Sequence, residues 1–156
     1  RIARDTVANT ASFGVAFSSC TLPRQKQPVF TLADDEMEIG MGIHGEPGVR
    51  HATMQSSEGI AKELCSAVAE DLALREGERI AVLVNGLGAT SREELFIIYR
   101  DVERILRSRG LVTAKAFVGE YATSMEMSGL SLSLLRLNDE RETYLNAAAY
   151  TPFANF

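Results

Sequence analysis

An apolar strand pattern lies between two amphipathic helical patterns, and this order restricts the fold more than any other feature of the sequence. The run Ile80-Ala81-Val82-Leu83-Val84 is typical of a strand that is covered on both faces. Apolar residues at helical spacing precede it from Ser57 to Arg75 and follow it from Thr90 to Gly110. Because helices that connect strands of one sheet act as crossovers, part of the sheet is predicted to be parallel. We therefore predict an α/β fold, a mixed β-sheet with helices packed against it.

Further local patterns extend this prediction. Strands are also predicted for the short apolar or alternating segments 12–17, 29–32, 37–43, 112–118 and 130–137. Thr90 and Glu93 have the spacing of a capping box at the start of the second long helix, and Gly77 is predicted to end the first. Repeats, low-complexity tracts and linkers are absent, so a single α/β domain is expected over residues 1–156. The chain starts with Arg1 and with helical spacing, so we expect a piece of a longer protein.

The charge balance excludes some classes of function. The chain has 16 basic and 21 acidic residues, a net charge of −5, which argues against binding to nucleic acid or to an anionic membrane surface. No stretch approaches 18 consecutive apolar residues, so no membrane span is expected. Cys20 and Cys65 lack the C-x-x-C spacing, so we expect a reducing, cytoplasmic compartment.

The segment from Met37 to Gly48 carries the most specific chemical signal. As a straight strand it would place four apolar side chains on one face and Glu38, Gly40, Gly42 and His44 on the other. Glycines within a strand often mark close approach of a ligand, so these two would leave space beside the imidazole. A straight strand would also put Glu38 about 20 Å from His44, which excludes it as a partner of the ring.

Glu46 lies across the predicted Gly45-Glu46-Pro47-Gly48 turn and can reach the ring of His44. An imidazole that a carboxylate holds in one tautomer can act as a base, a ligand or a nucleophile. A histidine that is only part of the core explains the same residue types, and the pattern by itself leaves both readings open.

Other candidate sites are weaker. Cys20, His44, His51 and Cys65 are candidate metal ligands, but their successive spacings of 24, 7 and 14 residues lack the close pairs of zinc sites, so no metal is expected. The loop 85–90 precedes a helix, a common place for anions, but a tight turn is favoured because no P-loop lysine follows. The Met-containing loop 121–129 fits a partner surface and a buried filler equally well.

Several separate blocks of the sequence resemble one enzyme family. The block Gly42-Ile43-His44-Gly45-Glu46-Pro47-Gly48, preceded by residues 35–40, resembles the signature of dihydroxyacetone kinases. The similarity is to their substrate-binding K subunit, or to the equivalent domain of the single-chain ATP-dependent enzymes. Further similar segments are 14–23, 83–90, 94–95, 123–129 and 151–152, so the resemblance runs from about Asn9 to the end of the chain.

The resemblance implies a role for one histidine. It implies that His44 attacks the ketone of dihydroxyacetone (glycerone) and holds it as a covalent hemiaminal, while a terminal hydroxyl is phosphorylated to dihydroxyacetone phosphate. Glycerol lacks the ketone and would be rejected. Gly42, Gly45 and Glu46 belong to the same motif and are candidates for lining the substrate pocket or orienting the ring.

The resemblance also implies what lies outside the chain. The family's first half carries a Gly-Gly-Ser-Gly-His loop and an acidic residue that grip the substrate, and that loop is absent here. We therefore expect the C-terminal half of a K subunit, unable to phosphorylate by itself. The phosphoryl donor, either ATP or a phosphorylated or ADP-loaded partner, is expected on a separate domain or on a nucleotide-binding L-type subunit, and no cofactor on this domain. A homodimer is expected.

Three other functions remain open at this point. A non-catalytic co-activator that binds dihydroxyacetone and signals to a transcription factor would keep the same histidine. A kinase for another short ketose, such as erythrulose, would share the motif. An α/β domain with His44 in its core would need no ligand at all.

Overall fold

The strands of the chain pair into one mixed sheet. In the computed structural model, which describes residues 1–43 and 48–152, they form a six-stranded sheet in the order β3-β2-β1-β6-β4-β5. The strands are β1 (Thr10–Ala16), β2 (Glu36–Ile39), β3 (Arg50–Thr53), β4 (Arg79–Gly86), β5 (Val112–Gly119) and β6 (Gly129–Arg136). The helices are α1 (Ile2–Ala8), α2 (Ser57–Asp71), α3 (Arg92–Ser108) and α4 (Asp139–Leu145). β4 and β5 are parallel, joined through α3, and the other pairs are antiparallel, so the predicted mixed α/β sheet is confirmed.

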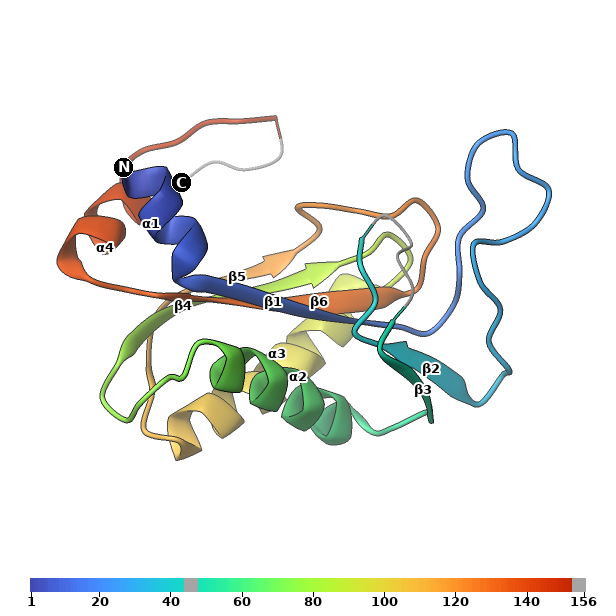
Figure 1. The fold of residues 1–156 in the computed structure, drawn as a ribbon, viewed down its shortest axis with the longest axis horizontal. Coiled ribbons are helices and arrows are strands. Elements are labelled where there is room, and N and C mark those ends of the chain that lie inside the picture. The colour runs from blue at the N-terminus through green and yellow to red at the C-terminus, as the bar shows by residue number, and fades with distance from the viewer. Residues whose placement is uncertain (44–47, 153–156) are drawn as a thin grey trace.

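The two long helices cover one face of this sheet (Figure 1). Alternate residues of the central strands point toward them, and the helices contribute residues at three- and four-residue spacing, as expected for amphipathic segments. The resulting core includes Val15, Leu64, Val82, Val102 and Leu132, each at most 1% exposed. The apolar faces of α2 and α3 thus pack against one face of the sheet and form a single core with it.

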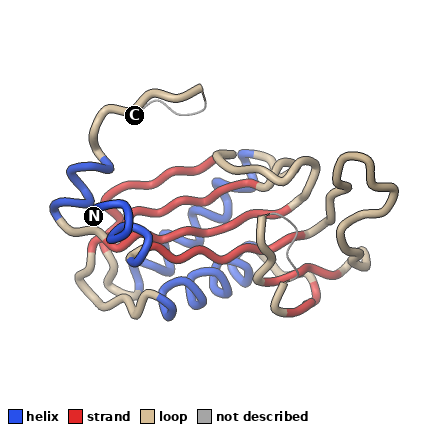
Figure 2. The backbone as a smooth tube through the Cα atoms, turned by 45° about the horizontal axis from the view of Figure 1, so that its top comes forward, coloured by secondary structure: helices blue, strands red, loops and turns tan. Residues whose placement is uncertain are grey.

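The opposite face of the sheet is covered mainly at one end. There α1 and α4 lie close together (Figures 1 and 2), joined by an ion pair in which Arg141 Nη1 donates to Asp5 Oδ2 at 2.5 Å. Farther along, Leu83 is partly exposed on this face although it belongs to the central strand β4. The predicted covering of residues 80–84 on both faces therefore holds only in part, since on this face Ala81 is buried and Leu83 is not.

Some predicted elements differ from the structure. Residues 29–32 form no strand, because their backbone contacts are single hydrogen bonds to a neighbouring loop, such as that from Val29 N to Cys20 O at 3.0 Å. The first long helix ends at Asp71 rather than at Gly77, because Ala73 has a left-handed φ of 47° that a helix cannot accommodate.

The capping box of α3 lies one residue later than predicted. Ser91 accepts a hydrogen bond from Glu94 N at 3.3 Å, and Ser91 N donates to Glu94 Oε2 at 2.8 Å. Thr90 is unavailable because its hydroxyl bonds both backbone groups of Gly129, at 2.7 and 2.8 Å. The buried Thr90 therefore ties the start of α3 to the start of β6, and the exposed Ser91 caps the helix.

A buried carboxylate joins the two long helices. Asp101 of α3 is 2% exposed and accepts hydrogen bonds from Arg100 Nε at 3.1 Å and from Ser57 Oγ of α2 at 2.8 Å. The hydrogen bonds from Arg100 and Ser57, together with Arg104, lower the pKa of Asp101 below its ordinary value in spite of its burial. Asp101 thus contributes to stability in its ionised form.

This carboxylate predicts an acid-dependent loss of stability. Because the folded-state pKa is lowered, the contribution is present above the unfolded-state value of about 4 and is lost as the pH falls through the folded-state value. We expect Asp101→Asn to cost about 1–3 kcal/mol at pH 7 and much less at pH 2.5, as measured by urea unfolding. A penalty that is equal at both pH values would contradict this role.

Candidate functional site

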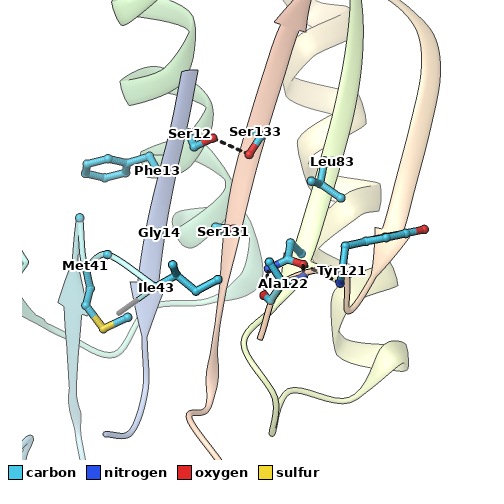
Figure 3. Close-up of a pocket in the computed structure, with 13 residues that line it drawn as sticks. Ser12, Phe13, Gly14, Met41, Ile43, Leu83, Tyr121, Ala122, Ser131 and Ser133 are labelled. Carbon is cyan, nitrogen blue, oxygen red and sulfur yellow. Dashed lines mark hydrogen bonds between the residues drawn. The ribbon is translucent and has the colours of Figure 1, made fainter. Parts of the chain in front are cut away.

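A cavity of about 380 Å³ opens on the sheet face that α2 and α3 leave uncovered (Figure 3). Its floor is made by β1, β4 and β6, and its walls by the segment after β2 and the loop after β5. The lining residues are Ser12, Phe13, Gly14, Gly40, Met41, Gly42, Ile43, Leu83, Asn85, Tyr121, Ala122, Ser131 and Ser133. This volume lies within the range of small-molecule sites.

Small side chains form the floor of the cavity. In β6, Leu130, Leu132 and Leu134 point into the core, so the alternate residues Ser131 and Ser133 face the cavity. Ser12 pairs with Ser133 across β1 and β6, and their hydroxyl oxygens lie 2.6 Å apart (Figure 3). These side chains leave room above the strands and provide hydroxyl groups that can donate or accept hydrogen bonds.

Asn85 fixes one wall of the cavity. This residue, 3% exposed at the end of β4, accepts hydrogen bonds from Tyr121 N at 2.8 Å and Ala122 N at 2.9 Å, and its Nδ2 donates to Ala122 O at 2.7 Å. The Tyr121 ring points away from the cavity (Figure 3), so the backbone of this loop forms the wall. Asn85, which the sequence placed in a loop over residues 85–90, therefore belongs to β4 and anchors the loop after β5.

The segment after β2 forms the opposite wall. The predicted strand 37–43 ends at Ile39, because Gly40 has a φ of 81° and turns the chain over β1, where Gly40 N donates to Gly14 O at 2.7 Å. A side chain on Gly14 would lie 2.8 Å from Met41 O, so this close approach requires glycine there.

The predicted common face of four apolar residues in 37–43 is wrong. Met37 and Ile39 belong to the main core, whereas Met41 lies in a second buried cluster with Cys20, Leu87 and Met127, and Ile43 packs against that cluster. The positive φ of Gly40 interrupts the alternation on which the expected face depended. Met127 of the Met-containing loop is thus a core residue, while Met125 is 41% exposed.

The residues predicted as the site are only partly described. Gly42 lines the cavity, next to Ile43. His44, Gly45 and Glu46 lie outside the residues that the structure describes. The described chain leads from the cavity wall up to Ile43 and resumes at Gly48, which directly flanks the β2–β3 pair.

Glu38 occupies a place that the sequence did not indicate. Its side chain is 5% exposed, and its Oε1 accepts a hydrogen bond from Gly48 N at 2.6 Å. The straight strand that would have placed Glu38 far from the histidine motif does not exist, because the chain turns at Gly40 and Val49 N returns to Ile39 O at 2.7 Å. Glu38 thus contacts the last glycine of the Gly42–Gly48 motif directly.

The candidate metal ligands that are described do not converge. Cys20 and Cys65 lie in different buried clusters, and burial raises the pKa of the Cys65 thiol to about 12, so it stays protonated. His51 lies instead beside Glu38, with Nε2 3.8 Å from Oε2, and beside Glu36. Within residues 1–43 and 48–152, no three His, Cys, Asp or Glu side chains are grouped to hold a metal ion. No helix of these residues is long and apolar enough to cross a bilayer.

Three polar residues of the cavity, Ser12, Ser131 and Ser133, were not singled out in the sequence, although Ser131 and Ser133 alternate with leucines in 130–134. Asn85 was considered only as part of a loop that could bind an anion. These residues converge because β6 pairs with β1, which lies more than 100 positions earlier in the chain, and with β4, which carries Asn85 opposite Ser131.

The fold and this cavity define an α/β domain with a small pocket on an open sheet face, lined by apolar side chains and a few serine hydroxyls. The family model described as the Dak1 domain matches residues 1–153. The chain therefore belongs to the Dak1 domain family.

Relatives within this family include kinases of short ketoses. The chain is 44% identical over 152 residues to D-erythrulose kinase of Mycolicibacterium smegmatis, covering 97% of the chain and 26% of that enzyme. It is 41% identical to the dihydroxyacetone-binding subunit DhaK of PTS-dependent dihydroxyacetone kinase 2 of Listeria innocua, covering 94% of the chain and 44% of that subunit. The chain thus spans less than half the length of these curated relatives.

Two solved structures show the same fold. The dihydroxyacetone kinase operon co-activator Dha-DhaQ superposes with a TM-score of 0.86 and 36% identity, over 94% of this chain and 46% of that one. The dihydroxyacetone kinase of C. freundii in complex with AMP-PNP and Mg²⁺ gives a TM-score of 0.70 and 34% identity, over 92% and 26%.

Proposed function

We propose that this chain is the ketone-binding part of a dihydroxyacetone or erythrulose kinase, and that His44 holds the substrate covalently. The observation that carries the proposal is the cavity beside Gly40, Gly42 and Ile43, since the chain runs from its wall directly into the Gly42–Gly48 motif. Membership of the Dak1 family and the kinases among its relatives support the same function.

The proposed step is an addition to the carbonyl group. The unprotonated ring nitrogen of His44 donates its lone pair to the carbonyl carbon, and the π electrons of the C=O bond move to the oxygen. That oxygen takes up a proton while the other ring nitrogen loses one, so the hemiaminal contains all the atoms of ketone and imidazole. Only a carbonyl compound can be held in this way, which would exclude glycerol.

The chemistry of the cavity suits a small polyhydroxy ketone. The hydroxyls of Ser12, Ser131 and Ser133 can donate to or accept from the hydroxyls of such a substrate. With about 380 Å³ the cavity has room for three or four carbons, so dihydroxyacetone and erythrulose both remain candidate substrates.

The rest of the kinase is proposed to lie outside this chain. We place the chain in the C-terminal half of a K subunit, in the cytoplasm and in a homodimer. The phosphoryl donor would come from another domain or from an L-type subunit, whether ATP or a phosphotransferase-system partner supplies it. The partial coverage of both the binding subunit and the C. freundii kinase supports this division.

The sequence contains two histidines, which provide a matched test. The full subunit is mixed with dihydroxyacetone labelled with ¹³C at the carbonyl carbon, and the shift of that carbon from the ketone to the tetrahedral region is followed by NMR. We expect His44→Ala to abolish the tetrahedral signal, because the attacking nitrogen is gone, and His51→Ala to retain it. A tetrahedral signal of full intensity in His44→Ala would overturn the proposal.

A co-activator is the second candidate function. The TM-score of 0.86 to Dha-DhaQ exceeds the 0.70 to the C. freundii kinase, which favours it. The two functions share ketone binding and differ in turnover. The full subunit is assayed with an L-type subunit and each phosphoryl donor on dihydroxyacetone and on both erythrulose enantiomers. Phosphorylation of any of them supports the kinase, and binding without turnover supports the co-activator.

A further inference from the structure

We propose that Glu38 is a positioning residue for His44, acting through the backbone of Gly48. The inference rests on the proposed function, in which His44 attacks the ketone. Glu38 is not one of the residues that line the cavity, so its effect is assigned to the segment that carries the histidine.

The environment of Glu38 is unusual for a carboxylate. Its side chain is 5% exposed, and in the described part of the chain the group within ion-pair distance is His51, whose Nε2 lies 3.8 Å from Oε2. Oε2 accepts no hydrogen bond from the described residues. Burial of a carboxylate without a guanidinium or ammonium partner is costly, so its presence needs a compensating interaction.

That interaction is the hydrogen bond from Gly48 N to Oε1 at 2.6 Å. A hydrogen bond from a backbone N–H to a carboxylate is among the stronger kinds. The fit is also steric, because a Cβ on Gly48 would lie 2.6 Å from Glu38 Cγ and 2.6 Å from Ile39 O. Gly48 thus packs flat against the Glu38 side chain, and only glycine fits there.

The chain is also anchored to the sheet on both sides of the motif. Before the motif, Gly40 N donates to Gly14 O at 2.7 Å, and after it, Val49 N donates to Ile39 O at 2.7 Å. The bond from Gly48 N to Glu38 extends this anchoring from Val49 to the last residue of the motif. Fixing the end of a short segment restricts the conformations of the residues it contains, which is how a remote carboxylate can orient a nucleophile.

Glu36 provides a matched control on the same strand. It lies on the same face of β2, two residues before Glu38, and its Oε2 is also near His51, 3.9 Å from Nδ1. Its side chain is 41% exposed, and its Oε2 accepts a hydrogen bond from Ala33 N, away from the motif. A general effect of removing charge near His51 would appear in both variants, whereas positioning through Gly48 would appear only at Glu38.

The experiment compares Glu38→Ala, Glu38→Gln and Glu36→Gln in the full subunit. Amide hydrogen exchange at Gly48 reports the contact, and the ¹³C-dihydroxyacetone titration reports the tetrahedral adduct. We expect Glu38→Ala to lose protection at Gly48 and to weaken adduct formation about 10- to 100-fold, the equivalent of one hydrogen bond to a charged group. Glu38→Gln keeps an acceptor for Gly48 N and should lose less, while Glu36→Gln should stay within about 2-fold of wild type.

The outcomes separate this inference from the proposed function. Adduct formation by Glu38→Ala that equals that of Glu36→Gln overturns the positioning role and leaves His44 as the nucleophile. Absence of an adduct in the wild type overturns the proposed function instead, and unchanged exchange at Gly48 in Glu38→Ala would then also reject the anchoring. If Glu38→Ala does not fold, as seen by thermal unfolding, the decision passes to Glu38→Gln by the same two measurements.

Discussion

Replacing Gly88 by alanine is expected to destabilise the protein by about 3–5 kcal/mol, a large part of the stability of a domain of this size. Gly88 has a φ of 131°, which a residue with a side chain rarely adopts. An added Cβ would also lie 1.8 Å from the carbonyl oxygen of Met125, so the backbone of that loop would have to move. Since Gly88 bridges to Met127, the change would disturb the second core cluster as well.

Gly77→Ala is the matched control for this prediction. Gly77 also has a positive φ, 84°, but an added Cβ would meet no atom within 4 Å. It should therefore cost only the conformational penalty of about 1–2 kcal/mol. Both variants are compared with wild type by urea unfolding, and equal losses would show that the contact with Met125 has no energetic weight.

Replacing Asn85 by leucine is expected to cost about 2–4 kcal/mol. Leucine has a similar size but removes all three hydrogen bonds to Tyr121 and Ala122, so three backbone groups near a buried side chain lose their partners. Because this loop forms one wall of the cavity, ketone binding should weaken as well.

The control for Asn85 is Asn146→Leu, at an exposed asparagine that accepts one hydrogen bond, from Lys115 Nζ at 3.2 Å. Its cost should stay within about 0.5 kcal/mol, with ketone binding unchanged. Unfolding free energies and the ¹³C titration are measured for both. If Asn85→Leu is as stable as Asn146→Leu, the loop after β5 does not depend on this side chain.

Local patterns predicted most elements of the fold, and the misplaced ones have identifiable causes. The helical spacing from Ser57 to Arg75 appears as α2, which ends at Asp71, and the apolar run at 80–84 appears as part of β4. In each segment the spacing of the apolar residues matches the period of the element that forms. The strand expected at 29–32 has no neighbour to pair with in the described structure. A strand depends on partners that local sequence does not specify.

Some residues of the candidate site were recognisable in the sequence, and others were revealed only by the structure. Gly42 and the motif around it were recognisable in the sequence, and Gly42 does line the cavity. Glu38 was set aside because a straight strand was assumed, and the turn at Gly40 removes that assumption. The cavity serines were missed, and Asn85 was interpreted only as part of a turn, because the site they form appears only once distant strands are paired.

The sequence by itself determined the alternation of helices and strands, the amphipathic faces that build the core, and the motif that identifies the family. These depend on residue periodicity and on short contiguous blocks, which are local properties. Only the tertiary structure decided that α2 and α3 leave one sheet face open, that β1 lies beside β6, and that Glu38 meets Gly48. The physical reason is that strand pairing and the burial of a carboxylate are non-local, since their free energy depends on partners brought together by the whole fold.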